Sequence, residues 1–197
     1  MNKLSLVSVI TVLMVVQSQA RMPCKEPAQW KAMGFDRDNK AKMKSRFEIS
    51  YDALKQRVRK VGIEQIGSKS DYVELIQLFN EKTEYRFSDT TKTCEKKALN
   101  QEWSDFSIPK NATFYGDFYI GASELKDSSV LVSSWVDNVN LGGQKYELLA
   151  LFTVNNCVPV SVYLDNDEHD YQVHFFNVSA KGLSDTDFSL PQECLIL

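Results

Sequence analysis

The chain has 197 residues, 43% of them hydrophobic and 25% charged, with 23 basic residues against 26 acidic ones. This length suits one domain of ordinary size, and the small negative net charge argues against electrostatic binding of nucleic acid. Four cysteines are too few for a disulfide-dense miniprotein. Two histidines leave little material for a zinc site or a histidine-based catalytic centre. The composition therefore favours a compact, mildly acidic globular domain.

Residues 1–20 have the features of a secretory signal peptide. Lys3 precedes an apolar run over residues 4–16, and a small-residue cleavage pattern ends in Ala20. The alternative, a membrane anchor, is disfavoured because the run is shorter than the roughly 20 residues that a bilayer span needs. We therefore predict cleavage after Ala20, a single mature domain over 21–197 with no transmembrane anchor, and export to an oxidising compartment.

The cysteines of the mature chain are Cys24, Cys94, Cys157 and Cys194. None belongs to a C-x-x-C pair, and a metal site or catalytic thiol would lack histidine partners at a useful spacing. In an exported protein they predict two disulfides, with three pairings open.

Two N-x-[ST] tripeptides fit the same compartment and predict N-glycosylation at Asn111 and Asn177. Asn111 follows Ile108-Pro109-Lys110, which has the composition of a loop, and is the better candidate. Asn177 lies in an apolar, strand-like run.

The hydrophobic period along the mature chain is mostly two, which is typical of half-buried strands. Apolar and polar residues alternate strictly over 46–51, and Gln56–Val61 completes a hairpin after a short turn. The further strand candidates are Tyr72–Phe79, Thr83–Ser88, Thr91–Leu99, Thr113–Ile120, Val130–Val136, Lys145–Val154, Val158–Leu164 and Tyr171–Val178. Nine or ten closely spaced strands predict an all-β sandwich or barrel. The highly charged stretch Asp36–Arg46 is interpreted as a solvated loop or hairpin tip.

The strand candidates are rich in aromatic residues, and two interpretations follow. One is an ordinary packed core, which the composition alone favours because most aromatic residues in strands are core. The other is a curved sheet that encloses an apolar cavity for a lipid-like ligand.

No catalytic constellation is recognisable: the chain has no G-x-S-x-G, H-E-x-x-H, P-loop or G-x-G-x-x-G motif. One acidic cluster, residues 165–170, lies between two strand candidates and offers Asp165, Asp167 and Asp170 as hard oxygen ligands for calcium. The EF-hand glycine and terminal glutamate are missing, so an ordinary acidic turn is the favoured interpretation.

Several segments together resemble the ependymin-related proteins, in the expected order along nearly all of the mature chain. The segment Ser50-Tyr51-Asp52-Ala53-Leu54-Lys55-Gln56-Arg57-Val58-Arg59 is similar to the family's S-Y-D-x-L-x-Q-R-V-R stretch. The other similar segments are Cys24–Trp30 (C-x-x-P-x-x-W), Thr91–Cys94 (T-K-x-C), Ile108–Phe114 (I-P-x-N-x-T-F), Phe152–Val160, Phe175–Asn177 and Leu190–Cys194.

The resemblance implies two curved antiparallel β-sheets stacked around a deep apolar pocket, a fold similar to bacterial lipoprotein carriers. It implies disulfides joining Cys24 to Cys157 and Cys94 to Cys194. It further implies a secreted or lysosomal glycoprotein, often a homodimer, that binds fatty acids or gangliosides, and it links the family to calcium and to cell–matrix contact.

With this resemblance, the cavity becomes the favoured interpretation of the aromatic strands. We expect a non-catalytic carrier that needs no cofactor, and an inward-facing set of pocket residues: Phe47, Ile49, Tyr51, Phe87, Phe118, Trp135, Tyr146, Phe152 and Phe175. The competing hypothesis is a calcium-responsive extracellular protein that acts through its surface in cell–matrix adhesion.

Overall fold

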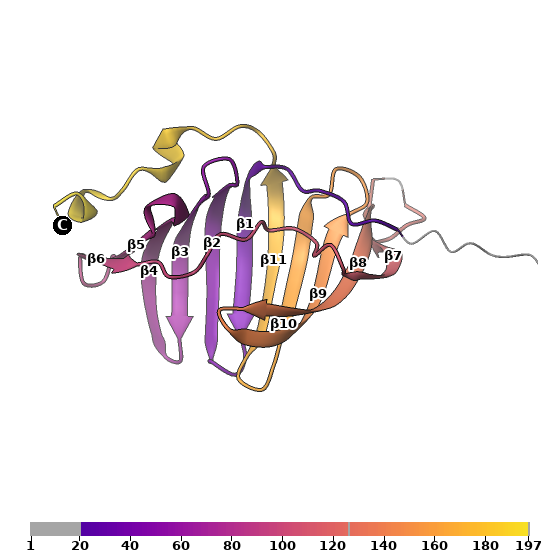
Figure 1. The fold of residues 1–197 in the computed structure, drawn as a ribbon, viewed down its shortest axis with the longest axis horizontal. Helices are drawn as coiled ribbons and strands as arrows, with labels where there is room; N and C mark the ends of the chain where they lie inside the picture. Colours follow the sequence, from indigo (N-terminus) through magenta and orange to yellow (C-terminus); the bar gives the residue numbers. More distant parts are fainter. Residues whose placement is uncertain (1–20, 126, 197) are drawn as a thin grey trace, which may run out of the picture.

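The structure, a computed structural model, describes residues 21–125 and 127–196; the signal peptide predicted over 1–20 lies outside them. Eleven antiparallel strands form one sheet, in the order β6-β5-β4-β3-β2-β1-β11-β10-β9-β8-β7 (Figure 1). The strands are β1 (Gln29–Asp38), β2 (Met43–Asp52), β3 (Arg57–Ile66), β4 (Lys69–Leu78), β5 (Thr83–Ser88), β6 (Thr93–Ala98), β7 (Thr113–Gly121), β8 (Ser129–Leu141), β9 (Gln144–Thr153), β10 (Pro159–Asp165) and β11 (Asp170–Ser179).

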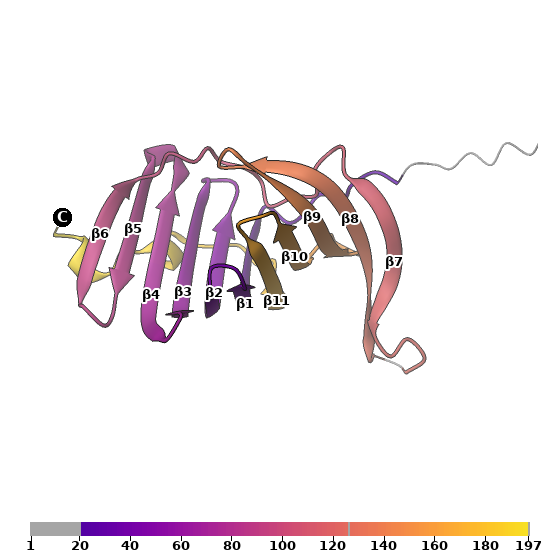
Figure 2. The same cartoon turned by 90° about the horizontal axis from the view of Figure 1, so that it is seen from below.

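The prediction of an antiparallel all-β fold is confirmed, but the expectation of two separate sheets is wrong. The first half of the chain forms a meander from β1 to β6, and the second half forms a meander from β7 to β11. Strand β1 pairs with β11 over the register that includes Gly34 opposite Phe175 and Asp38 opposite Tyr171. This ladder fuses the two meanders into one sheet, which bends into an open arch with β6 and β7 at its two ends (Figure 2).

Strand β1 is the one strand that the hydrophobic pattern did not predict. The stretch Asp36–Arg46, interpreted above as a solvated loop or hairpin tip, does contain the turn at 39–42. However, Asp36 and Asp38 belong to β1, and both are buried. Their partners come from distant strands, so their burial is set by tertiary structure rather than by local pattern.

Two aspartates start the turns on either side of β2. The Asp38 carboxylate accepts the backbone N–H groups of residues 40 and 41, each at 3.0 Å. The Asp52 carboxylate accepts those of residues 54 and 55 at 3.1 and 3.2 Å. Each turn ends in a residue of positive φ, Lys42 or Gln56. These side-chain-to-backbone bonds explain why each strand ends where it does.

The hydrophobic core lies on one side of the sheet, here called the inner face. The crossing segment, residues 99–112, connects β6 to β7 and runs over this face in front of the central strands (Figure 1). Its Phe106 ring lies 5.7 Å from Trp30, 5.4 Å from Phe175 and 6.5 Å from Phe152, measured between ring centroids. The crossing segment therefore completes the core by covering the middle of the sheet.

The C-terminal segment, residues 180–196, covers the opposite or outer face of β3 to β6. It contains the short helices η2 (Asp185–Phe188) and η3 (Gln192–Cys194). The Arg57 guanidinium lies 4.0 Å from the centroid of the Phe188 ring and 2.9 Å from the Asp185 carboxylate. No helix in the described part of the chain has the length and apolar character of a membrane span.

Candidate ligand-binding site

The strand pairings place seven of the nine predicted pocket residues on the inner face, because residues directly opposite one another in an antiparallel pair share a face. Phe47, Tyr51, Trp135, Phe152 and Phe175 are buried in the core cluster there. Ile49 packs against that cluster, and Tyr146 is half-buried. Phe87 and Phe118 lie on the outer face, opposite Cys94 and Val132 respectively. The role of these nine side chains in ligand binding stays a prediction.

The central inner-face aromatics pack against the crossing segment. Trp103 stacks on Tyr51 with ring centroids 5.3 Å apart, and the Tyr51 hydroxyl accepts the backbone N–H of Phe106 at 2.9 Å. Burial raises the pKa of Tyr51 to about 12, and the nearby Glu26 and Asp105 carboxylates act in the same direction. The middle of the predicted cavity is therefore packed core in this structure.

Open apolar space lies beside that core, in a pocket of about 320 Å³ that we call the hairpin pocket. Its wall is formed by the tips and ends of three hairpins, β1–β2, β8–β9 and β10–β11, and its lining is mainly apolar. The lining residues are Asp38, Ala41, Met43, Leu141, Tyr146, Leu164, His169 and Tyr171. A volume of this size is at the small end of the range typical of ligand pockets.

One row of side chains across four adjacent strands lines the hairpin pocket. Leu164 pairs with Tyr171, Tyr171 with Asp38, and Asp38 with Met43, so these four share the inner face. Leu141, at the end of β8, contributes an apolar side chain from the neighbouring hairpin. The row exists only because β1 pairs with β11, which brings residues about 130 positions apart side by side.

A buried acid and a histidine form the polar rim of the hairpin pocket. The Asp38 carboxylate contacts His169 Nδ1 at 2.6 Å and also accepts the Asp170 N–H at 3.3 Å. Burial acts to raise the pKa of Asp38, but the hydrogen bonds from the Ala41 amide and the His169 ring outweigh it, and the pKa lies below its usual range. Asp38 is therefore held as a carboxylate, and its bonds fix the rim.

A second buried acid, Asp36, lies next to Asp38 on the inner face of β1. It accepts hydrogen bonds from Lys60 Nζ at 2.5 Å, from the Tyr171 hydroxyl at 3.1 Å, and from the Ser45 hydroxyl. Lys60 also lies 4.1 Å from the centroid of the Phe47 ring. Burial and the Asp36 carboxylate both raise the pKa of Tyr171, so Tyr171 stays neutral and presents its ring to the pocket.

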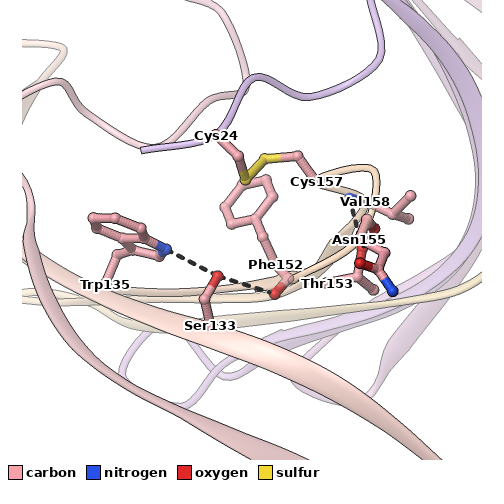
Figure 3. Close-up of a disulfide and its surroundings, with 8 residues drawn as sticks. All are labelled: Cys24, Ser133, Trp135, Phe152, Thr153, Asn155, Cys157 and Val158. Atoms are coloured by element: carbon pink, nitrogen blue, oxygen red, sulfur yellow. Dashed lines mark hydrogen bonds between the residues drawn. A yellow bond between two sulfur atoms is a disulfide. The ribbon is translucent and has the colours of Figure 1, made fainter. Parts of the chain in front are cut away.

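The structure forms both disulfides that the family resemblance implies, Cys24–Cys157 and Cys94–Cys194. Figure 3 shows Cys24–Cys157 beside the Phe152 ring, at the turn between β9 and β10. Below it, the Trp135 indole donates to Ser133 at 3.1 Å, and Ser133 donates to the Phe152 carbonyl at 3.3 Å. This bridge fixes the N-terminal segment over the core, whereas Cys94–Cys194 fixes the C-terminal segment on the outer face.

The acidic loop proposed as a calcium site contains a lysine ammonium group from another hairpin. Lys40 Nζ lies 3.1 Å from the Asp165 carboxylate and also donates to the carbonyl of Asn166. Asp170 accepts from Asn39 at 2.5 Å, while the side chain of Asp167 is exposed. Within 21–125 and 127–196, no group of three Asp, Glu, His or Cys side chains is arranged to hold a metal ion.

The sequence model of the ependymin family matches residues 67–194, which is more than half of the chain. The chain belongs to the ependymin family. Mammalian ependymin-related protein 1 from Mus musculus is 29% identical over 177 residues, covering 87% of this chain and 76% of the mouse protein. Ependymin from Clupea harengus is 25% identical over 174 residues, covering 86% of this chain and 79% of the herring protein.

Among solved structures, an uncharacterized conserved protein from Thermus thermophilus is similar to this chain with a TM-score of 0.56. The likeness covers 85% of this chain and 88% of that chain at 7% sequence identity. LprF from Mycobacterium bovis gives a TM-score of 0.48 at 11% identity, over 85% of this chain and 90% of that chain. The first of these likenesses supports the all-β architecture of this ependymin-family chain and nothing about its ligand.

Both predicted glycosylation asparagines of this ependymin-family chain are exposed. Asn111 lies in a turn just before β7, where the Ala112 N–H donates to the Pro109 carbonyl at 3.0 Å. Asn177 lies in β11 at an irregularity of the β1–β11 ladder and has a φ of 52°. Glycan occupancy at either residue stays a prediction.

Sequence reasoning included only Tyr146 of the apolar residues that line the hairpin pocket. Met43 and Leu141 lie at strand ends, where the alternation that marks a buried face is shortest. Leu164 and Tyr171 flank the acidic loop, and the carboxylates of that loop suggest a calcium site rather than an apolar pocket. The signal that joins these residues is the ladder between β1 and β11, and no local pattern contains it.

Proposed function

We propose that this protein is an exported, non-catalytic carrier that binds a hydrophobic ligand of the fatty-acid or glycolipid class in the hairpin pocket. The observation that carries the proposal is an open, mainly apolar pocket of about 320 Å³ on the inner face of the arch. The chain belongs to the ependymin family. The resemblance to that family implies hydrophobic ligands, which supports the same class of ligand. Binding of this kind needs no acid, base or nucleophile.

The driving force is the removal of an acyl chain from water, which contributes about 0.8 kcal/mol for each buried methylene group. Met43, Leu164 and the Tyr171 ring provide apolar surface for such a chain, with Asp38 between Met43 and Tyr171. The Asp38–His169 pair at the rim lies within reach of the polar end of the ligand. A ligand with one apolar chain and one hydrogen-bonding head group matches this apolar lining and the polar Asp38–His169 pair.

Two bridges between segments distant in the sequence support export, because disulfides persist mainly in oxidising compartments. We place the protein outside the cell, with the lysosomal lumen as the second compartment that the resemblance implies. Homodimer formation and matrix contact, which the resemblance implies, are separate proposals that ligand binding does not require.

The proposal is tested by titrating delipidated, secreted protein with a fluorescent fatty-acid analogue. Leu141→Glu places a carboxylate at the pocket wall, on a side chain already about one-third exposed, so the fold is kept. Leu54→Glu is the matched control, since Leu54 is exposed in the β2–β3 turn, at the opposite end of β2 from Met43. We expect at least about tenfold weaker binding in Leu141→Glu, equal to about 1.4 kcal/mol, and no change in Leu54→Glu.

Two outcomes contradict the proposal. The first is the absence of saturable binding by the wild-type protein. The second is equal binding by both variants, which would place the ligand elsewhere on the molecule.

A further inference from the structure

The outer face carries a groove that the proposed function does not use. It has a volume of about 210 Å³ and lies across β11, β1, β2 and β3, beside the C-terminal segment. Its walls include Lys31, Met33, Glu48, Arg59, Asn177 and Asp187. We call it the outer groove.

One wall of the outer groove is an asparagine of an N-x-[ST] tripeptide, Asn177-Val178-Ser179. Asn177 is exposed, and its left-handed φ of 52° sits at the irregularity where the register of β11 against β1 shifts. Its side-chain nitrogen, the atom to which an N-linked glycan attaches, lies 3.6 Å from Met33 Sδ. A sugar on this nitrogen therefore starts inside the groove, in contact with Met33.

The walls of the outer groove have the chemistry that a sugar ring needs. Met33 in the wall and its directly paired neighbour Phe176 beside the groove are 48% and 54% exposed, and they offer apolar surface for the C–H face of a ring. Glu48 supplies acceptors, and Arg59, which donates from Nε to Glu74, has further N–H donors for sugar hydroxyl and acetamide groups. The Lys31–Asp187 ion pair links the C-terminal segment to β1 at the groove.

We propose that the outer groove is the seat of the first sugar of an N-linked glycan on Asn177. The seated sugar covers Met33 and Phe176 and connects β11 to the C-terminal segment. The glycan is thus part of the folded structure at this position. Asn111 lies in an exposed turn outside this groove, so a glycan there extends into solvent and does not pack against the protein.

The test compares protein secreted from a glycosylating host with protein made without glycosylation. Ser179→Ala removes the tripeptide while keeping Asn177 and its backbone conformation, and Thr113→Ala is the matched control for Asn111. We expect Ser179→Ala to lower the Tm of the glycosylated protein by about 2–4 °C or more, and Thr113→Ala to leave it unchanged. In the unglycosylated host, Ser179→Ala and the wild type should melt together, which separates loss of the glycan from loss of the serine.

A second measurement does not depend on stability. Native secreted protein is treated with an amidase that releases N-linked glycans, and the release from each site is followed by peptide mass spectrometry. We expect release at Asn177 to be at least about tenfold slower than at Asn111, and the two rates to become equal after denaturation. An unoccupied Asn177, or equal release rates in the native protein, would overturn the proposal. If a second copy of the chain covered the groove instead, Asn177 would be unoccupied and the protein would be a dimer.

Discussion

The Nδ1 atom of His169 lies 2.6 Å from the Asp38 carboxylate, so the turn between β10 and β11 is bonded to the end of β1 at the rim of the hairpin pocket. The same carboxylate accepts backbone N–H groups from the β1–β2 turn. One buried acid thus holds together two hairpins that are more than a hundred residues apart in the sequence. Its ionisation state should therefore control the stability of the rim.

We predict that Asp38→Asn lowers the free energy of unfolding at pH 7 by about 1.5–3 kcal/mol, the range for hydrogen bonds to a charged group. The pKa of Asp38 is below its usual range in the folded protein. Its contribution is therefore fully present above the unfolded-state pKa of about 3.9 and is lost as the pH falls through the lower, folded-state pKa. Urea unfolding from pH 7 to pH 3 should show the gap between wild type and variant closing at the acid end. A gap that does not depend on pH would contradict this account, and Asp167→Asn, on an exposed side chain, is the control.

Strand β3 approaches β2 so closely at Gly62 that no side chain fits there. A Cβ atom added to Gly62 would collide with the Arg46 carbonyl oxygen and would lie 2.6 Å from Phe47 Cα. We predict that Gly62→Ala destabilises the protein by about 3 kcal/mol or more. Gly116→Ala in β7, where an added Cβ meets no atom within 4 Å, should stay within about 0.5 kcal/mol of the wild type. Thermal melts of the two variants check this, and similar losses in both would refute the close-approach argument.

The two disulfides should differ in what their removal exposes. Replacing Cys94 and Cys194 by serine frees the C-terminal segment from the outer face, so we predict rapid proteolysis within 180–196 while the sheet stays folded. Replacing Cys24 and Cys157 removes a bridge that lies over Phe152 in the core, and it should lower global stability by about 2–5 kcal/mol. Limited proteolysis with mass spectrometry, alongside denaturant unfolding, distinguishes the two effects. The reverse assignment would mean that the C-terminal segment is part of the cooperative core.

Calcium at millimolar concentration should leave the Tm of the protein unchanged. The physical reason is that the Lys40 ammonium already provides the positive charge beside Asp165 and the Asn166 carbonyl. The measurement is a thermal melt with calcium and with a chelator. A Tm that rises with calcium concentration, and loses this rise in Asp167→Asn, would instead support the calcium-responsive alternative.

The hydrophobic pattern and the turn residues between segments predicted ten of the eleven strands. They could not locate β1, because the buried face of that strand carries Asp36 and Asp38 beside Trp30 and Ala32. Charged residues are buried only when distant groups satisfy them, and here those groups are Lys60, Tyr171 and His169. The ladder between β1 and β11, which turns two meanders into one sheet, was missed for the same reason.

The kind of site, an apolar pocket lined by aromatic residues, was predictable from the sequence, but its position was only partly predictable. The period of two set most of the predicted aromatic residues on the inner face. It could not show that Trp103 and Phe106, from a segment without strand pattern, pack over them. Because that segment fills the centre of the arch, the open apolar pocket lies at the ends of the hairpins instead. Tyr146 is the one predicted residue that lines it.

The most direct test of the carrier hypothesis is photo-crosslinking of delipidated, secreted protein with a photoreactive fatty acid, followed by peptide mapping. We predict saturable labelling on peptides that contain Met43 and on those that contain Leu141 or Tyr146, suppressed by excess unlabelled fatty acid. Labelling confined to the exposed apolar side chains of the outer face, Met33, Ile63 and Tyr72, would contradict the account, as would labelling that excess fatty acid does not suppress.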